Sequence, residues 1–408
     1  MALAGQAQAD INVPARLAAA AKVREQAGFL GLFAALSAYT LSTMDGGDIA
    51  PRIISAVLLL VTAYYFGVPF QQSVTFSLPT CCLLLMACYG VCQTLWSPQK
   101  IVYDGVTGVL FWFTAALIAL LASQVFQDRA KAIRFRFVFV IFGSGVCLLD
   151  LLEQASRTNR YLWLIPSRYH SISGSFAYWN NFAQFVELVL PITLWLGLAR
   201  RKPAPSYLLL SALEIGAVAA SGSRAGAFLV IVELITVLML VYLQNRNRTF
   251  LYSASLVVAL STIFVYAAGF DTLVGKLQQN DQLNVRREID KSSLDMIRQR
   301  PLTGWGLDTY VPVYRMFARY DDGTYVNRAH NDWLQWAAEG GIFFSGCMLV
   351  IFLWSLRPAI RSVWGIGVIA VCLHALVDYP FARFGVCGWY FALLGMLAAY
   401  REEGLPHR

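Results

Sequence analysis

The sequence predicts an all-α, polytopic membrane protein with about twelve transmembrane helices, and two observations carry this prediction. Of the 408 residues, 58% are hydrophobic and only 14% are charged, so the chain cannot cover its apolar side chains with its own polar surface. The apolar stretches are mostly about 17 to 21 residues long, the length at which a helix crosses ~30 Å of hydrocarbon. A transmembrane β-barrel would instead show alternating segments of about ten residues.

The predicted spans follow a polar, weakly amphipathic N-terminal segment. Because no compact apolar core with a small-residue cleavage site appears before Gly28, we expect this segment to be a cytoplasmic lead-in and not a signal peptide. The spans are expected near residues 27–44, 53–70, 76–95, 106–126, 137–153, 178–198, 207–221, 226–244, 251–269, 331–356, 363–377 and 384–400. The predicted parts of the chain are residues 1–269 with helices one to nine, a helical loop domain at 270–329, and 330–408 with helices ten to twelve and a cytoplasmic tail.

The charges of the connecting segments predict the orientation. The segments DRAKAIRFR, ARRKPAP, NRNR, RPAIR and REEGLPHR are basic and all lie on one side of the twelve spans. That side, with both termini, holds 16 Lys and Arg residues, whereas the opposite short loops hold 7 and the 270–329 loop holds the other 9. Short basic loops stay in the cytoplasm, so we expect the long loop on the outer face.

Several functional classes lack support in the sequence. All eight cysteines fall inside predicted spans, where a small buried hydrophobe is the common role, so neither disulfides nor a metal site is expected. The net charge of +8 favours anionic lipid headgroups and phosphates over nucleic acid, because no soluble basic domain could hold a duplex. No P-loop, Rossmann glycine signature or DxD-type metal triplet occurs in a loop, which argues against ATP hydrolysis and nucleotide-sugar use.

His330, in the run RAHNDWLQWAAEGG, is the leading candidate for a catalytic residue. It stands at the head of the tenth span, directly after the arginine-rich loop, where an imidazole could accept a proton beside an anionic, lipid-linked substrate. The amide groups at the start of that helix are also favourable to a diphosphate. The ordinary alternative is a helix-end histidine bonded to a backbone carbonyl.

Arg224 is a candidate phosphate ligand in the short turn SGSRAG. Its guanidinium must lie at or just below the membrane surface, where an isolated charge is costly. A guanidinium binds phosphate oxygens in bidentate fashion, and the small neighbours would let a bulky ligand approach the backbone. Pairing with an acidic residue of a neighbouring span is an equal alternative.

Arg286 and Arg287 lie in a helical stretch of the long loop, NVRREIDKSSLDMIRQR. Val285, Ile289 and Met296 fall roughly on one stripe of this stretch, and Pro301 with the GWG run ends it. On composition alone, the favoured interpretation is an amphipathic helix at the membrane surface whose cations contact lipid headgroups.

Carboxylates in or beside the spans have more than one possible role. Asp378, in HALVDYP at the end of the eleventh span, could orient a base or hold a sugar hydroxyl, or be a solvated helix-end group. Glu187, Glu214 and Glu233 lie well inside predicted spans, where a carboxylate usually has a functional role. These three residues are the best argument that the protein is a transporter. Bonds to neighbouring helices or a pair with Arg224 are equally open.

Four segments together indicate a family. SGSRAG, PLTGWG, HNDWLQWAAEGG and HALVDYP occur in the order and spacing seen in the O-antigen ligase and polymerase superfamily of bacterial envelope glycosyltransferases, which the chain resembles over roughly residues 170 to 385. The segment ISGSFAYWNNFA is similar to the family's segment ahead of the sixth span but lacks its proline, so no role is assigned to Asn180 or Asn181.

The resemblance implies a GT-C-like, metal-independent and inverting enzyme of the bacterial inner membrane, with its active site on the periplasmic face. The nominated residues are, as catalytic groups, His330, Arg224 and Arg287 and, as substrate-binding groups, Arg286, Asp378 and Asn331. The expected partners are a glycan linked to undecaprenyl diphosphate, a lipid A-core acceptor and membrane lipids, with no cofactor and no nucleic acid.

An O-antigen ligase is the leading interpretation, because the chain has one dominant outer loop and a polymerase would more often carry two arginine-rich ones. A polymerase of O-antigen or exopolysaccharide, with a lipid-linked glycan as acceptor, is the alternative. A lipid-linked glycan flippase or transporter is less favoured, because it would need ionisable residues along an aqueous path and detectable inverted repeats, and no repeat is seen.

Overall fold

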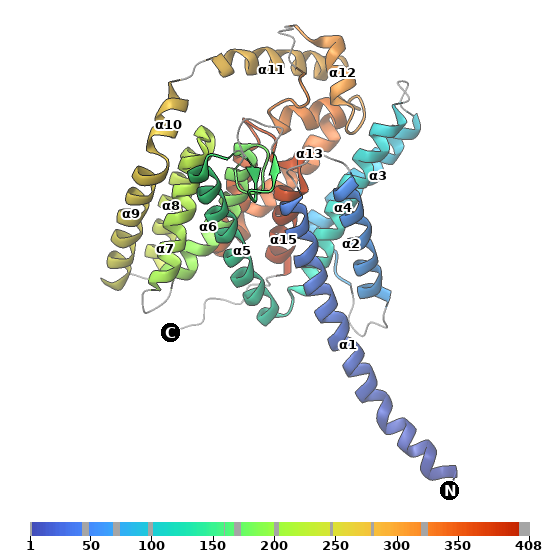
Figure 1. The fold of residues 1–408 in the computed structure, drawn as a ribbon. Coiled ribbons are helices and arrows are strands. Elements are labelled where there is room, and N and C mark those ends of the chain that lie inside the picture. Colours follow the sequence, from blue (N-terminus) through green and yellow to red (C-terminus); the bar gives the residue numbers. More distant parts are fainter. Residues whose placement is uncertain are drawn as a thin grey trace.

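The computed structural model describes residues 2–42, 49–67, 74–96, 101–158, 160–166, 173–199, 204–244, 248–278, 281–319 and 325–399. These residues form fifteen α-helices, two 3-10 turns and one short β-hairpin, which confirms the predicted all-α fold of a polytopic membrane protein. Figure 1 shows the long helices as a bundle, with α11 and α12 lying across one end and the N-terminal part of α1 extending from the other. The basic connectors at residues 200–203 and 245–247 and the tail at 400–408 lie outside the described residues.

Each of the twelve predicted spans corresponds to a helical segment. These segments are α1 (Ala2–Leu41), α2 (Ile49–Gly67), α3 (Leu78–Trp96), α4 (Val102–Val125), α5 (Arg129–Ser156), α6 (Trp179–Leu198), α7 (Pro205–Ser221), α8 (Arg224–Gln244), α9 (Arg248–Ala268), α13 (Asp332–Arg361), η2 with α14 (Val363–Gly365 and Ile366–His374) and α15 (Phe384–Ala399). Within the described residues, eight helices are long and apolar enough to cross a membrane, and α7, η2 with α14, and α15 are shorter apolar helices.

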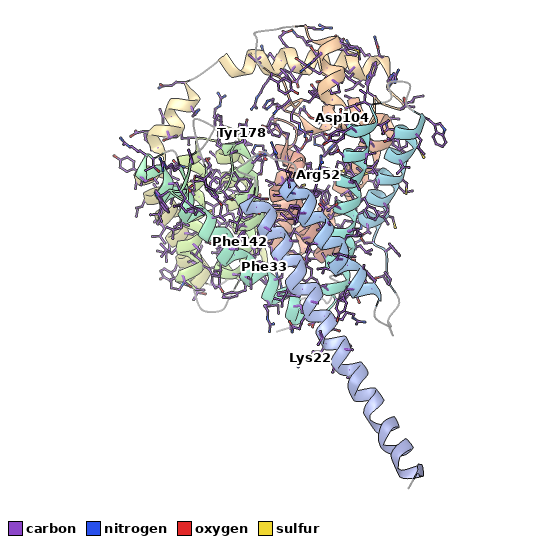
Figure 2. All side chains as sticks on the ribbon, turned by 45° about the vertical axis from the view of Figure 1, so that its right-hand side comes forward. Lys22, Phe33, Arg52, Asp104, Phe142 and Tyr178 are labelled. Carbon is purple, nitrogen blue, oxygen red and sulfur yellow. The ribbon has the colours of Figure 1, made fainter. Side chains whose placement is uncertain are left out.

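The bundle core is aromatic and centres on Trp389 of α15, which has no exposed surface. Its ring stacks on Phe139 of α5 with centroids 4.1 Å apart and meets Phe33 of α1 edge-on at 5.7 Å. Phe33 also contacts Phe142 of α5 at 6.1 Å, a pair labelled in Figure 2. Such pairs contribute about 0.5 to 1.5 kcal/mol each beyond the area they bury, so α15 holds α1 and α5 in fixed positions.

The helices of the long loop are α10 (Phe270–Leu277), α11 (Asp281–Gln299) and α12 (Tyr310–Phe317). The predicted stripe on α11 exists, but Ile289 and Met296 are buried in a small core with Trp305, Tyr310 and neighbouring residues of α12 and α13. Protein side chains therefore cover the apolar stripe of this helix, whereas contact of its cations with lipid headgroups stays a prediction.

The PLTGWG run docks onto a break in α13. Gly341 interrupts that helix with φ 63° and ψ −161°, and the freed backbone groups pair with the loop. The amides of Trp305 and Gly306 donate to the carbonyls of Ala338 and Glu339, and the Ile342 amide donates to the Pro301 carbonyl, all at 2.9 Å. The run thus not only ends α11 but also fixes the loop to the N-terminal part of α13.

A short β-hairpin and a 3-10 turn lie between helices, and all eight cysteines lie in helices. The strands β1 (Arg160–Tyr161) and β2 (Ile165–Pro166) pair as a hairpin, and η3 (Pro380–Ala382) precedes α15. All eight cysteines are free in the structure. Cys88 and Cys92 are exposed on α3, so the interpretation of every cysteine as a buried hydrophobe is wrong for these two.

Candidate active site

SGSRAG forms the turn between α7 and α8. Gly222 ends α7 in the left-handed conformation (φ 74°), and the Ser223 hydroxyl accepts a hydrogen bond of 3.1 Å from the Gly226 amide as α8 begins. Gly222 packs against Lys276 of α10, and Gly226 packs against Ala183 of α6. The space that we expected a ligand to use beside these two glycines is occupied by side chains, so the small residues serve close helix packing.

His330 lies just before α13 in a left-handed backbone conformation with φ 53°, which few residues other than glycine adopt. Both of its neighbours are fixed to α13. The Ala329 amide donates to Gln335 Oε1 at 3.2 Å, and Asn331 Oδ1 accepts from the Leu334 amide at 3.1 Å as the helix N-cap. The start of α13 therefore sets the position of the imidazole.

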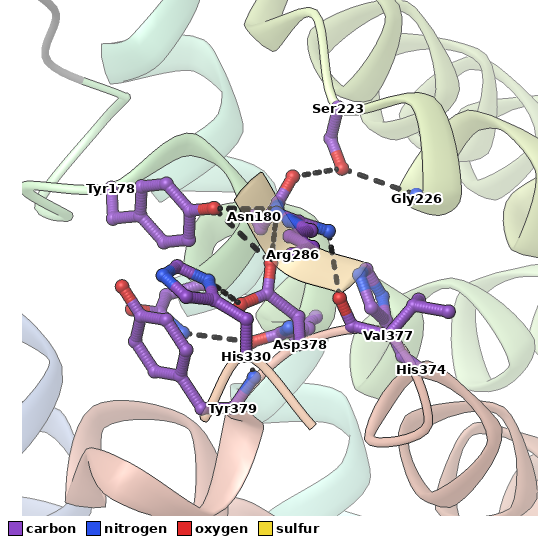
Figure 3. Close-up of polar contacts among 12 residues, drawn as sticks. Tyr178, Asn180, Ser223, Gly226, Arg286, His330, His374, Val377, Asp378 and Tyr379 are labelled. Carbon is purple, nitrogen blue, oxygen red and sulfur yellow. Dashed lines mark hydrogen bonds and ion pairs between the residues drawn. The ribbon is translucent and has the colours of Figure 1, made fainter. Parts of the chain in front are cut away.

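Asp378 is the centre of the polar cluster in Figure 3. It lies in the turn after α14 and is fully buried. Its Oδ2 accepts hydrogen bonds from the Tyr178 hydroxyl at 3.3 Å and from the Asn180 side-chain amide, and its Oδ1 accepts from the Tyr379 amide at 3.0 Å. His330 Nδ1 lies 3.4 Å from Oδ1. Residues 178–180 and His330, which are distant in the sequence, thus converge on this one carboxylate.

The electrostatics of this cluster favour an ionised Asp378. Burial alone would raise the pKa of its carboxyl group, but the His330 imidazole and the Arg286 guanidinium outweigh burial and lower that pKa below its ordinary value. A carboxylate beside Nδ1 of His330 favours the tautomer protonated at Nδ1, which leaves the lone pair on Nε2. Because 24% of the His330 side chain is exposed, Nε2 can take a proton from a bound molecule.

The structure distinguishes the two adjacent arginines of α11. Arg286 donates to the Val377 carbonyl at 2.8 Å and to the Tyr178 hydroxyl at 3.3 Å, and its Nη2 lies 3.8 Å from Asp378 Oδ2. Arg287 is exposed and has no polar partner among the described residues. Arg286, nominated for substrate binding, is therefore the arginine that reaches the His330 cluster, whereas Arg287, nominated as catalytic, lies outside it.

Arg224 and Asn331 also have defined places. Arg224 is the first residue of α8, next to Ser223, whose hydroxyl donates to Asn180 Oδ1 at 2.7 Å, so the SGSRAG turn adjoins the Asp378 cluster. The carboxamide oxygen of Asn331 is used as the cap of α13. The Asp332 amide donates to the Ala375 carbonyl at 2.9 Å, so α13 offers fewer amides to a diphosphate than we expected.

The sequence assigned no role to the aromatic and amide residues around Asp378, which are Tyr178, Asn180 and Tyr379. Tyr178 and Tyr379 stack with centroids 5.4 Å apart, and the His330 ring meets Tyr379 edge-on at 4.9 Å. Asn180 links Asp378 to the SGSRAG turn through Ser223. The signal for these residues in the sequence was the polar and aromatic run AYWNN. It stands at the head of the sixth predicted span, just as His330 stands at the head of the tenth.

The carboxylates deeper in the bundle have partners on neighbouring helices. Glu187 Oε1 lies 2.7 Å from His374 Nδ1, and neither side chain has exposed surface. Glu214 Oε1 accepts hydrogen bonds from Ser144 at 2.7 Å and Thr193 at 2.9 Å. Glu233, also buried, has no hydrogen-bond partner among the described residues. Two of the three thus contact neighbouring helices, and no described contact pairs them with Arg224.

Comparison with known families agrees with the order of the motifs. Residues 207–349 match the family model described as O-Antigen ligase. This segment, the O-antigen ligase domain, is similar to that family. The match confirms the predicted place of the chain in the O-antigen ligase and polymerase superfamily. The O-antigen ligase domain contains Arg224, Arg286 and His330, whereas Asp378 follows it and Tyr178 precedes it. A search of curated proteins and a search of solved structures each found no match.

Proposed function

We propose that the protein is an O-antigen ligase of the bacterial inner membrane, which transfers a glycan from undecaprenyl diphosphate to a sugar hydroxyl of lipid A-core on the periplasmic face. One observation carries the proposal. His330, which lies in the O-antigen ligase domain and is partly exposed, is beside the buried carboxylate of Asp378, which follows the domain, and near the guanidinium of Arg286. This arrangement joins a base, the group that orients it, and a cation at one place.

The proposed reaction follows from these groups. The acceptor hydroxyl oxygen bonds to the anomeric carbon as the bond from that carbon to the diphosphate oxygen breaks. The hydroxyl proton passes to His330 Nε2, and the electron pair leaves with undecaprenyl diphosphate, whose growing negative charge Arg286 and Arg224 stabilise. Attack from the face opposite the diphosphate inverts the anomeric carbon. Because the donor already has a good leaving group, we propose that a GT-C-like bundle performs the transfer without a metal.

A cellular experiment tests the assignment. Cells that carry only His330→Ala or Arg224→Ala are expected to accumulate lipid-linked O-antigen and to make lipopolysaccharide of core length. Exposed Arg298, which pairs with Asp295 on α11, provides a matched control, since Arg298→Ala should leave capping intact. Normally capped lipopolysaccharide in either site variant would refute the assigned role.

A second experiment separates ligase from polymerase, because the O-antigen ligase domain is compatible with both. Purified protein is given a long preassembled donor together with either lipid A-core or a single-repeat, lipid-linked glycan. We expect capped lipid A-core. Lengthening of the lipid-linked glycan without capping would mean that the protein is a polymerase that uses the same site and is not a ligase.

A further inference from the structure

Lys276 lies beside the candidate active site, although neither the motifs nor the proposed mechanism includes it. Its ammonium lies over the ring of Trp179, 4.4 Å from the centroid, and its stem packs against Gly222 of the SGSRAG turn. Trp179 begins α6, between Tyr178 and Asn180, both of which contact Asp378. The lysine therefore borders the cluster from the side of α10.

The position of Lys276 is fixed by helix packing. Gly269, at the start of α10, lies so close to the backbone of Ala219 and Ala220 that a side chain there would collide with α7. The last turn of α10 is thereby held over the turn from α7 to α8. Its lysine is also half-buried, so the fold places a cation at this point instead of leaving it in open solvent.

The charge of Lys276 is not offset by a carboxylate within the described part of the chain, where its recorded partner is the Trp179 ring. A cation–π contact at a partly exposed site is weaker than a charge-assisted hydrogen bond to phosphate. Arg286 differs, because Asp378 lies 3.8 Å from its guanidinium and offsets part of its charge. A diphosphate, which carries negative charge on both phosphates, needs cations besides Arg286.

We propose that Lys276 is a donor-binding residue whose ammonium moves from the Trp179 ring to a phosphate of the lipid-linked donor. This inference rests on the proposed transferase function. The lysine stem is flexible, and the Trp179 ring belongs to the residue next to Tyr178, so the ammonium can turn from the ring toward a donor bound at the cluster. Lys276 binds the donor and takes no part in proton transfer, which His330 performs.

Purified full-length protein in nanodiscs tests this role through binding of undecaprenyl diphosphate. Lys276→Met keeps the stem that packs on Trp179 and Gly222 but removes the charge, and we expect its Kd to rise about tenfold, equivalent to ~1.4 kcal/mol. Lys276→Arg should restore most of the affinity. Lys291→Met is the control, because that lysine lies in α11 and already pairs with Glu288 at 2.6 Å; its Kd should not change. In transfer assays, Lys276→Met should raise KM for the donor and leave kcat and KM for the acceptor near wild type.

Two results would overturn the inference. One is equal binding by wild type and Lys276→Met. The other is an effect of Lys276→Met in phosphatidylcholine nanodiscs that disappears when phosphatidylglycerol is added, because the ammonium would then serve lipid headgroups in general. Either result leaves the transferase function standing if the wild type still transfers glycan and His330→Ala does not. Conversely, if the wild type binds the donor through Lys276 but transfers no glycan, the proposed transferase function is wrong and the proposed binding role of Lys276 stands.

Discussion

Two histidines of this bundle contact carboxylates, and their surroundings are opposite. His330 is 24% exposed and lies 3.4 Å from Asp378 at the end of the bundle that α11 covers. His374 and Glu187 have no exposed side-chain surface and lie 2.7 Å apart between α14 and α6. A partly exposed imidazole can exchange a proton with a bound molecule, whereas a sealed one joins two helices. The same pair of chemical groups can thus serve catalysis in one place and packing in another.

The largest effect is expected from breaking the contact between the partly exposed His330 and Asp378. His330→Ala should lower kcat by about 10² to 10⁴, equivalent to ~3 to 5 kcal/mol, because general base catalysis is lost. The midpoint of thermal unfolding should stay near that of the wild type, since the side chain is not part of the bundle core. Transfer assays with the purified protein, together with a melting curve, measure both. A kcat within about threefold of wild type would exclude His330 as the base.

Breaking the sealed pair should affect stability instead. His374→Leu leaves Glu187 buried beside an apolar side chain, so we expect the free energy of unfolding to fall by about 3 kcal/mol. Adding Glu187→Met should recover most of the loss, because no unpaired carboxylate remains. Activity per folded molecule should stay within a few-fold of the wild type. If His374→Leu removed activity as completely as His330→Ala without destabilising the protein, the distinction between the two histidines would be wrong.

The pH dependence of Asp378→Asn sharpens the comparison. The pKa of Asp378 is lower in the folded protein than its ordinary value, so its ionisation stabilises the fold at neutral pH and that stabilisation declines as pH falls through its folded-state pKa. The wild type should therefore unfold at a higher temperature than Asp378→Asn at pH 7. The difference should shrink below about pH 4, where the wild-type carboxyl group begins to take up a proton. A difference in unfolding temperature that is constant from pH 7 to pH 3 would show that the charge of Asp378 does not contribute to the stability of the fold.

The fold was predictable from the sequence because its signals are local. Apolar runs of span length gave a helix at each of the twelve expected positions, and the order of four motifs predicted the family that residues 207–349 confirm. What covers the apolar stripe of α11 was not predictable, because an apolar stripe on a helix looks the same whether lipid or protein covers it. Only the tertiary structure shows Ile289 and Met296 packed against Trp305 and Tyr310.

The site was only partly predictable, for a related reason. His330 and Asp378 stand at the ends of predicted spans, so composition and position sufficed to nominate them. Asn180 and Tyr178 act through contacts with Asp378, about 200 residues away in sequence, and a single sequence does not record such contacts. The choice between Arg286 and Arg287 depends on which face of α11 meets the turn after α14, and that is set by the packing of the loop.

A smaller effect separates those two arginines. Arg286→Lys keeps the charge but loses the fork that reaches both the Val377 carbonyl and the Tyr178 hydroxyl, so we expect kcat/KM to fall about tenfold. Arg287→Lys is the matched control on the same turn and should change kcat/KM by less than about twofold, because Arg287 is exposed and makes no polar contact with the described residues. A larger loss of kcat/KM in Arg287→Lys would support the original nomination of Arg287 as a catalytic residue.

The smallest expected effect is that of metal removal. In the proposed mechanism, the guanidinium groups of Arg286 and Arg224 stabilise the negative charge on the departing diphosphate, which a divalent cation does in other enzymes. No group of three or more His, Cys, Asp or Glu side chains in the described ranges could hold a metal ion. If the cations of the protein meet this charge, transfer by purified protein should change by less than about twofold when EDTA is added. A loss of activity that Mg²⁺ restores would mean that a metal meets this charge, and the arginines at the end of the bundle would then position the donor without stabilising its leaving group.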